Sequence, residues 1–229
     1  MLWCPSKLAS RNGTPRLLAS PFGVAYSGYM ERPGLSRLIS RVVWGGDSKS
    51  YYDSMCAVAE VADGGTIIDC PWGAGPALRA LRPDAEVRYL AADLSPSMLR
   101  RVRKRAASRG LGRVEFIEAD AGDLPFPAES ADLFLSFWGL HCFEDSPAAL
   151  AEAARVLRPG ARLVGSCFVR EDDSLRQRLL VRVGSGDFGQ VGTEPEVVAL
   201  LEAAGFEASK ADRSGPMLFF DARFSGQPS

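Results

Sequence analysis

The stretch from Thr66 to Gly75 combines a short apolar run with a glycine-bearing loop, Thr-Ile-Ile-Asp-Cys-Pro-Trp-Gly-Ala-Gly. The run ends at Asp69, which predicts a buried strand with a polar end. Gly73 and Gly75 follow, and because glycine has no Cβ, backbone N–H groups there can approach a ligand closely. Pro76 suits the first turn of a helix. A strand, a tight loop and a helix in this order predict the opening unit of a nucleotide-binding α/β domain.

Three further apolar runs follow at regular intervals, at residues 87–92, 114–118 and 131–136. The first of them ends at Asp93, and Asp120 follows the second. With Asp69, these acids are predicted to meet at the carboxyl ends of parallel strands, where open α/β sheets bind ligands. An ionised carboxylate only accepts hydrogen bonds, so three of them suit the hydroxyls and exocyclic amine of a nucleoside.

The remaining pattern completes an α/β domain. It predicts helices at 34–44, 49–62, 95–109, 146–156 and 193–204, and further strands at 162–169, 206–211 and 217–224. In the first helix the apolar residues are expected to face inward and the arginines outward. Residues 171–192 are interpreted as an insertion that forms a lid. We therefore expect a Rossmann-like, doubly wound, seven-stranded sheet that is mostly parallel, with a C-terminal antiparallel hairpin and helices on both faces.

One structural domain is expected, with residues 1–62 as an N-terminal extension and helical cap and residues 63–229 as the ligand-binding domain. A formal net charge of −1 gives no basic excess for nucleic acid. The basic cluster at 100–105 is expected to occupy a solvated helix face. Five scattered cysteines without a Cys-x-x-Cys pair predict neither disulfides nor zinc, and they favour a cytoplasmic location. No apolar run predicts stable membrane insertion, and residues 1–30, which lack acids, only faintly suggest a transit peptide.

Four motifs in order resemble those of a known family. They are the Asp69 to Gly75 loop, Ala92-Asp-Leu-Ser-Pro-Ser-Met-Leu99, Asp120-Ala-Gly-Asp-Leu-Pro-Phe126 and Arg155-Val-Leu-Arg-Pro-Gly160. The chain resembles class I S-adenosylmethionine-dependent methyltransferases over about Thr66 to Phe224. Within that class it is similar to the small-molecule branch that includes the ubiquinone and menaquinone methyltransferases.

The resemblance implies S-adenosyl-L-methionine as cofactor and assigns roles residue by residue. Asp69 and the glycine backbone would surround the methionine part, Asp93 would accept from the ribose hydroxyls, and Asp120 would accept from the adenine amine. One position departs from the family, which usually has glycine where this chain has Pro71. The cofactor-binding residues implied are Asp69, Gly73, Gly75, Asp93, Leu94, Asp120, Ala121, Ser136 and Phe137.

The acceptor is expected to be a small, apolar or aromatic molecule, methylated at oxygen, carbon or nitrogen. Residues expected to contact it are Tyr26, Tyr29, Trp138 and His141, and further aromatic candidates of the cap are Trp44, Tyr51 and Tyr52. His141 is the single histidine and a candidate catalytic base. A hydrogen-bonded structural histidine and a substrate contact without proton transfer are the alternatives.

Two other functions remain open from the sequence. A nicotinamide-dependent oxidoreductase would need a glycine where Leu78 stands. A binder of S-adenosylmethionine without activity would follow if Pro71 and the adjacent Trp72 prevent turnover. The arginine-rich, alanine-rich composition hints at secondary metabolism, and a homodimer is left open.

Overall fold

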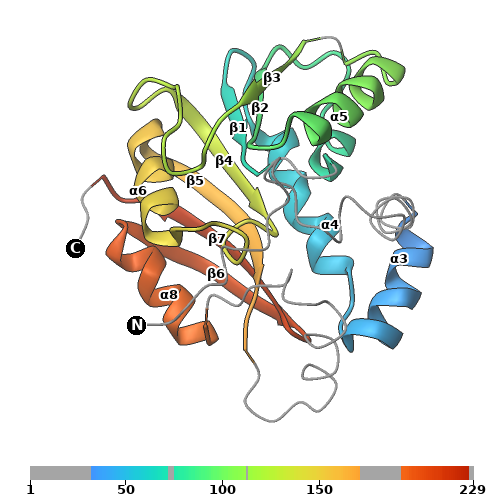
Figure 1. Cartoon of the computed structure of the whole chain (residues 1–229), viewed down its shortest axis with the longest axis vertical. Coiled ribbons are helices and arrows are strands. Elements are labelled where there is room, and N and C mark those ends of the chain that lie inside the picture. Colours follow the sequence, from blue (N-terminus) through green and yellow to red (C-terminus); the bar gives the residue numbers. More distant parts are fainter. Residues whose placement is uncertain (1–31, 72–74, 112, 171–191, 227–229) are drawn as a thin grey trace.

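The computed structural model describes residues 32–71, 75–111, 113–170 and 192–226. Their centre is a seven-stranded sheet in the order β3-β2-β1-β4-β5-β7-β6 (Figure 1). Strands β1 to β5 run parallel to one another, and β7 lies antiparallel between β5 and β6. The fold class predicted from the sequence is confirmed. The strands are β1 Thr66–Asp69, β2 Arg88–Asp93, β3 Val114–Glu118, β4 Ala131–Phe137, β5 Leu157–Phe168, β6 Phe206–Ser214 and β7 Met217–Phe224.

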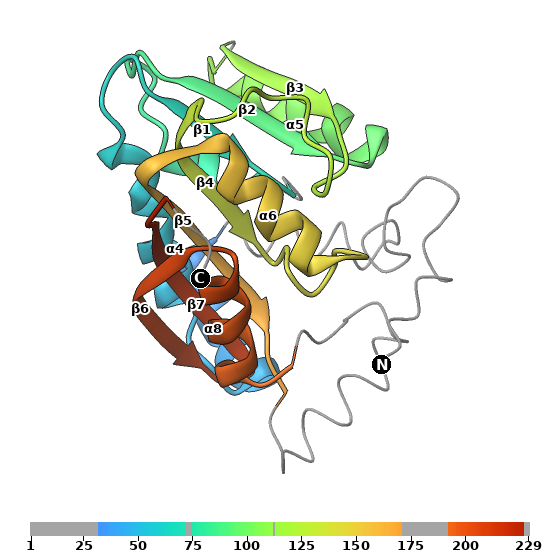
Figure 2. The ribbon, with the colours of Figure 1, turned by 90° about the vertical axis from the view of Figure 1, so that its left-hand side faces the viewer.

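Helices cover both faces of this sheet (Figure 2). Several begin where their capping residues predict. Asp145 accepts a hydrogen bond from the Ala148 N–H at the start of α6, and a capping box of Thr193 and Glu196 opens α8. The helices are α3 Pro33–Ile39, its π-helical continuation η2 Ser40–Trp44, α4 Lys49–Met55, the 3-10 segments η3 Cys56–Glu60 and η4 Pro76–Arg79, α5 Pro96–Ser108, α6 Ser146–Val156 and α8 Glu194–Ala203.

Successive residues of each strand point to opposite faces, and so the core has two halves. Ile68 packs in the half that contains Leu150 of α6 and Leu201 of α8. Ile67 packs in the other half, with Met55 of α4 and Val102 of α5. Because β1 is buried on both faces, its run of apolar residues is continuous, as is typical of a central parallel strand.

Three predicted elements differ in the structure. The helix after the glycine loop is only the 3-10 turn Pro76–Arg79, and the helix expected at 49–62 changes to 3-10 geometry at Cys56. Strand β5 begins at Leu157 because this residue already pairs with Ala131 of β4. The Pro159-Gly160 pair therefore lies inside the strand, in an irregular stretch, and does not separate a helix from a strand.

For the first helix, the outward position predicted for Arg37 and Arg41 is confirmed, because both are exposed, but the inward position predicted for its apolar residues is wrong. Leu35, Leu38 and Val42 are exposed, whereas Ser36 and Ser40 are buried. The helix lies at the periphery of the molecule (Figure 1), and hydrophobic periodicity alone does not show which surface an apolar stripe meets. Gly73, Tyr26, Tyr29 and nearly all of the expected lid lie outside the described residues.

Candidate functional site

Asp69, the last residue of β1, is a buried carboxyl group at the carboxyl edge of the sheet, 2% exposed. The Tyr89 hydroxyl donates a hydrogen bond to its Oδ2 at 2.7 Å. Burial raises the pKa of Asp69 to about 8; the bond from Tyr89 lowers this pKa and the charge of Asp93 raises it. Without a positive partner, this carboxyl group is therefore largely protonated at neutral pH.

Asp93 ends β2, directly beside β1, and is also buried. Its Oδ1 accepts a hydrogen bond from the Ser95 N–H at 2.8 Å, so the carboxylate is anchored at the entry to α5. Leu94, between them, is 52% exposed. An exposed leucine beside a buried acid leaves an apolar surface next to the strand end.

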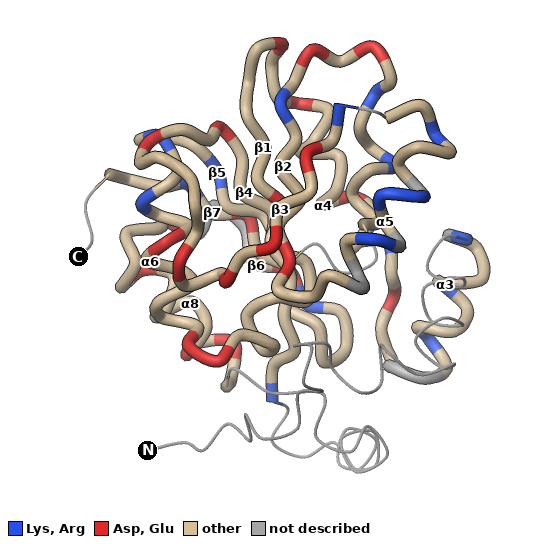
Figure 3. Tube along the Cα trace, turned by 45° about the horizontal axis from the view of Figure 1, so that its top comes forward, with Lys and Arg blue, Asp and Glu red and all other residues tan. Residues whose placement is uncertain are grey.

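Asp120 lies just beyond β3, where it is exposed and accepts a hydrogen bond from the Gly122 N–H at 2.9 Å. Burial raises the pKa of the Cys70 thiol well above its usual value, and the charges of Asp93, Asp69 and Asp120 raise it further. All three carboxylates thus act on one buried thiol. They share one edge of the sheet, as the strand pattern predicts, and Figure 3 shows acidic positions gathered between α5 and α6.

Ser136 brings a polar group to the same edge from β4, which pairs with β1. Its Oγ is buried and has no hydrogen-bond partner within the described part of the chain. A Cβ at Gly139 would lie 2.1 Å from this oxygen and 2.6 Å from the Pro71 Cδ. Only glycine allows the loop after β4 to close so tightly over the end of β1. A buried hydroxyl group without a partner in the protein is usually satisfied by a bound ligand or an ordered water molecule.

Aromatic rings follow Ser136 along the chain. Phe137 is buried, and its ring meets that of Tyr51 of α4 edge to face at 5.5 Å between centroids. Trp138 adopts a left-handed backbone conformation, with φ of 60°, and this reverses the chain after β4. The ring of Phe168 lies 5.4 Å from Trp138. Together these contacts form an aromatic wall beside the strand ends.

His141 is 5% exposed, and its Nδ1 accepts a hydrogen bond from the Phe168 N–H at 3.2 Å. Burial lowers the pKa of the imidazole to about 3. The ring is therefore neutral at pH 7, and its proton is on Nε2 because Nδ1 is an acceptor. This environment favours the structural histidine that the sequence left open as an alternative to a base.

Sequence reasoning missed Tyr89 and Gly139. Tyr89 reads as an ordinary strand residue, because only the parallel register of β1 and β2 brings its hydroxyl to Asp69. Gly139 stands alone in its loop, without a second glycine to mark it. Of the other predicted residues, Gly75 has a left-handed φ of 65° and Ala121 is buried.

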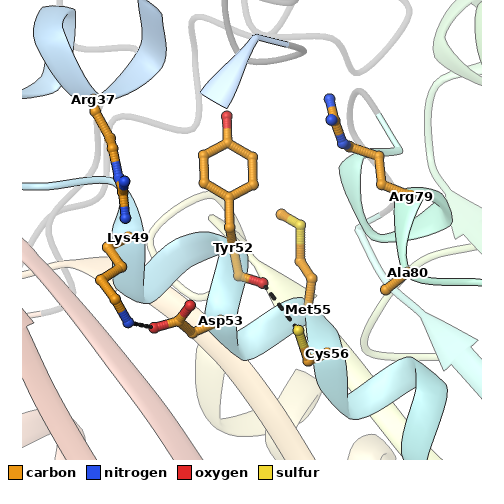
Figure 4. Close-up of a pocket in the computed structure, with 8 residues that line it drawn as sticks. All are labelled: Arg37, Lys49, Tyr52, Asp53, Met55, Cys56, Arg79 and Ala80. Carbon is orange, nitrogen blue, oxygen red and sulfur yellow. Dashed lines mark hydrogen bonds and ion pairs between the residues drawn. The ribbon is translucent and has the colours of Figure 1, made fainter. Parts of the chain in front are cut away.

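A pocket of about 380 Å³ opens between the N-terminal helices and η4 (Figure 4). Tyr52, Met55 and Cys56 of the α4 and η3 segment line one side, and Arg79 and Ala80 line the other. Groups of His, Cys, Asp and Glu side chains that could hold a metal ion are absent among the described residues.

The comparisons with known proteins agree with this geometry. A methyltransferase domain model matches residues 68–165. The chain is 37% identical over 164 residues to demethylmenaquinone methyltransferase of Thermus thermophilus, covering 61% of this chain and 73% of that protein. It is 32% identical over 144 residues to the ubiquinone/menaquinone biosynthesis C-methyltransferase UbiE of Teredinibacter turnerae, covering 62% of this chain and 58% of that protein.

Solved structures show the same fold. A SAM-dependent methyltransferase from Aquifex aeolicus superposes with a TM-score of 0.62 at 20% identity, covering 87% of this chain and 97% of that chain. The chain spans only about half the length of several of the curated relatives that it matches. The residues matched by the methyltransferase domain model, 68–165, include the three acids Asp69, Asp93 and Asp120.

Proposed function

Because the chain belongs to the class I S-adenosylmethionine-dependent methyltransferases, we propose that it methylates a small, apolar aromatic acceptor, with a ring carbon as the favoured atom over oxygen or nitrogen. Two relatives, a demethylmenaquinone methyltransferase and a ubiquinone/menaquinone biosynthesis C-methyltransferase, support carbon as the methylated atom. The observation that carries the proposal is that Asp69, Asp93 and Asp120 lie at or just beyond the carboxyl ends of the neighbouring parallel strands β1, β2 and β3.

The described residues fit S-adenosylmethionine. Asp69 offers a buried carboxyl group that an ammonium would ionise, and Asp93 ends the neighbouring strand, with its Oδ1 anchored by the Ser95 N–H. The Ser136 hydroxyl is a buried group that still needs a partner. We propose that these side chains hold the amino acid part and the ribose, and that Asp120 and Ala121 hold the adenine. When bound, the cofactor supplies an electrophilic methyl group on a sulfonium.

The protein's own contribution is then orientation and exclusion of water. Phe137 and Tyr51 are buried and pack edge to face beside the end of β4, and we propose that this apolar packing borders a flat, apolar acceptor. His141 is neutral and already accepts a backbone hydrogen bond, so we propose that it shapes the loop after β4. Trp138 stays a candidate for acceptor contact, as do Tyr26 and Tyr29, which lie outside the described residues.

The assignment of Asp93 is tested by calorimetry with S-adenosylhomocysteine. Asp93→Asn keeps an oxygen for the Ser95 N–H but replaces one acceptor with a donor, so binding should weaken by at least about tenfold, since each charge-assisted bond is worth about 1.5–3 kcal/mol. Asp84→Ala is the matched control, because it removes a carboxylate from an exposed turn. Equal affinities for the two variants would refute the ribose assignment.

Turnover separates the proposed enzyme from the alternatives. We expect transfer of labelled methyl from S-adenosylmethionine to a naphthoquinol or a polyhydroxylated benzene, with the product carbon identified by mass spectrometry. Binding of S-adenosylhomocysteine without transfer to any tested acceptor would favour the inert binder. Binding of NAD in its place would favour the oxidoreductase.

A further inference from the structure

The helical segment formed by α3 and η2, residues 33–44, turns its apolar residues to solvent. Leu35 is 40% exposed, Leu38 61% and Val42 65%, at positions i, i+3 and i+7 on one helix face. The opposite face is buried and polar, with Ser36 at 0% and Ser40 at 8% exposed. A helix that buries serines and exposes leucines is reversed relative to an ordinary surface helix, which indicates that its outer face contacts an apolar partner.

The charges beside this apolar stripe are positive. Arg32, Arg37 and Arg41 are exposed, and residues 32–46 contain no acid. The nearest carboxylate, Asp47, accepts a hydrogen bond from Arg41 at 2.7 Å and pairs with Arg37 at 3.5 Å. One carboxylate shared by two arginines leaves the surface with a positive excess.

The same asymmetry extends over the N-terminal part of the chain. Residues 1–44 contain six Lys or Arg and one acid, whereas the whole chain has 27 Lys and Arg and 28 Asp and Glu. The remaining residues thus carry 21 basic and 27 acidic side chains. A chain that is nearly neutral as a whole therefore has one basic end, and the exposed apolar stripe lies within it.

We propose that the face formed by Leu35, Leu38 and Val42 docks on an anionic lipid bilayer, with the flanking arginines against lipid phosphates. Basic amphipathic helices bind membrane surfaces in this way, with their apolar side chains at the boundary between headgroups and acyl chains. None of the helices in the described part of the chain could span a bilayer. The proposed contact is with the bilayer surface. Figure 1 places α3 at the edge of the molecule, and Figure 3 shows its basic positions.

A second copy of the chain fits this face less well. A two-fold interface would place the same surface on both subunits, and so it would bring Arg32, Arg37 and Arg41 of each copy near those of the other. Like charges opposite one another are unfavourable, whereas anionic phosphates complement them. The charge of the surface thus selects lipid as the occupant. The docking face contains none of the residues assigned to the cofactor, so this proposal does not depend on the proposed function.

Vesicle co-sedimentation of the full chain tests the proposal. We expect binding to phosphatidylcholine vesicles that contain phosphatidylglycerol, at least about tenfold tighter than to phosphatidylcholine alone. Leu38→Ser with Val42→Ser should weaken this binding without any change in charge, and Leu38→Glu with Val42→Glu should abolish it. The matched control is Ala199→Glu with Ala203→Glu, which adds two acids to exposed positions of α8 and should bind as the native chain does.

Three results would overturn the proposal: equal binding to both vesicle types, full binding by the Leu38→Glu and Val42→Glu variant, or no vesicle binding at all. Light scattering distinguishes the rival occupant, since a native dimer that the same variant converts to monomers would assign the face to a second copy. Calorimetry with S-adenosylhomocysteine confirms that each variant is folded. Loss of vesicle binding with intact cofactor binding supports the docking face, whatever the acceptor proves to be.

Discussion

Asp69 and His141 are buried titratable side chains close to the strand ends, and burial moves their pKa values in opposite directions. The pKa of Asp69 rises to about 8 and that of His141 falls to about 3. Both groups are therefore held largely uncharged at neutral pH. Only Asp69 lies at the end of a central strand, where a positively charged ligand group could restore its charge. The two residues thus have different consequences for function.

The role of His141 can be separated by two substitutions. His141→Asn can still accept from the Phe168 N–H, so we expect a methylation rate within about tenfold of the native rate and an unchanged pH profile, because general-base catalysis contributes about 10²–10⁴-fold. His141→Phe leaves that buried N–H without an acceptor and should lower the free energy of unfolding by about 1–3 kcal/mol. If the methylation rate of a correctly folded His141→Asn variant no longer depended on pH, His141 would again be the best candidate for the catalytic base.

Residue identity could be predicted only where a local pattern marks it. The acids Asp69, Asp93 and Asp120 follow strands directly, so their shared edge follows from the strand pattern. The hydrogen bond from Tyr89 to Asp69 depends on strand register, which the sequence does not reveal. The burial of His141 depends on packing against Phe168, a residue distant in sequence. Its candidacy as a base rested on position alone.

Among the secondary-structure elements, α6 stabilises the loop that carries Asp120. Arg155 on this helix donates to the Leu124 carbonyl at 3.0 Å and to the Phe126 carbonyl at 2.9 Å. Glu152, one turn earlier, accepts from the Leu124 N–H at 2.9 Å and pairs with Arg155. These bonds lower the pKa of Glu152, with the hydrogen bond from Arg155 as the main cause. The motif that begins at Arg155 is therefore connected to the motif that begins at Asp120, although the two are far apart in the sequence.

Arg155→Lys should break this connection. A lysine ammonium cannot reach two carbonyls and a carboxylate in the geometry of a guanidinium, so we expect the free energy of unfolding to fall by about 1–2 kcal/mol. Affinity for S-adenosylhomocysteine should also fall, because the Asp120 loop loses its support. Arg158→Lys is the control, since Arg158 is exposed and pairs with Asp132 near the start of β4, at the end of the strand away from Ser136. Chemical denaturation and calorimetry give both quantities, and identical behaviour of the two variants would contradict the connection.

Element boundaries were predictable where capping chemistry is local. The start of α6 follows from Asp145 and Pro147, and the start of α8 follows from the capping box. The face of α3 was not predictable, because hydrophobic periodicity gives the width of an apolar stripe but not the surface that it meets. The length of η4 also escaped prediction, since Pro76 is compatible with one helical turn or with several.

At the scale of the whole molecule, the two buried groups give stability an unusual pH dependence. His141 has a folded pKa of about 3 against an ordinary value of 6.5, so the unfolded chain binds more protons and stability rises with pH up to about 6.5. Asp69 has a folded pKa of about 8 against 3.8, so the folded chain binds more protons and stability falls as pH rises from about 4 to 8. Between about 4 and 6.5 the two contributions oppose each other.

Above pH 6.5 only the contribution of Asp69 remains. The free energy of unfolding of the ligand-free chain should therefore fall by up to about 2 kcal/mol between pH 6.5 and 8, since each pKa unit corresponds to about 1.36 kcal/mol. Asp69→Asn keeps an acceptor for the Tyr89 hydroxyl but cannot ionise, so urea unfolding should show this fall in the native chain and not in the variant. The difference in the free energy of unfolding between the native chain and the variant at each pH removes the contributions of the titratable groups that both proteins share. Parallel curves would mean that Asp69 is already ionised at neutral pH. The site would then hold a negative charge before any ligand binds, and ligand binding would not be coupled to proton release from Asp69.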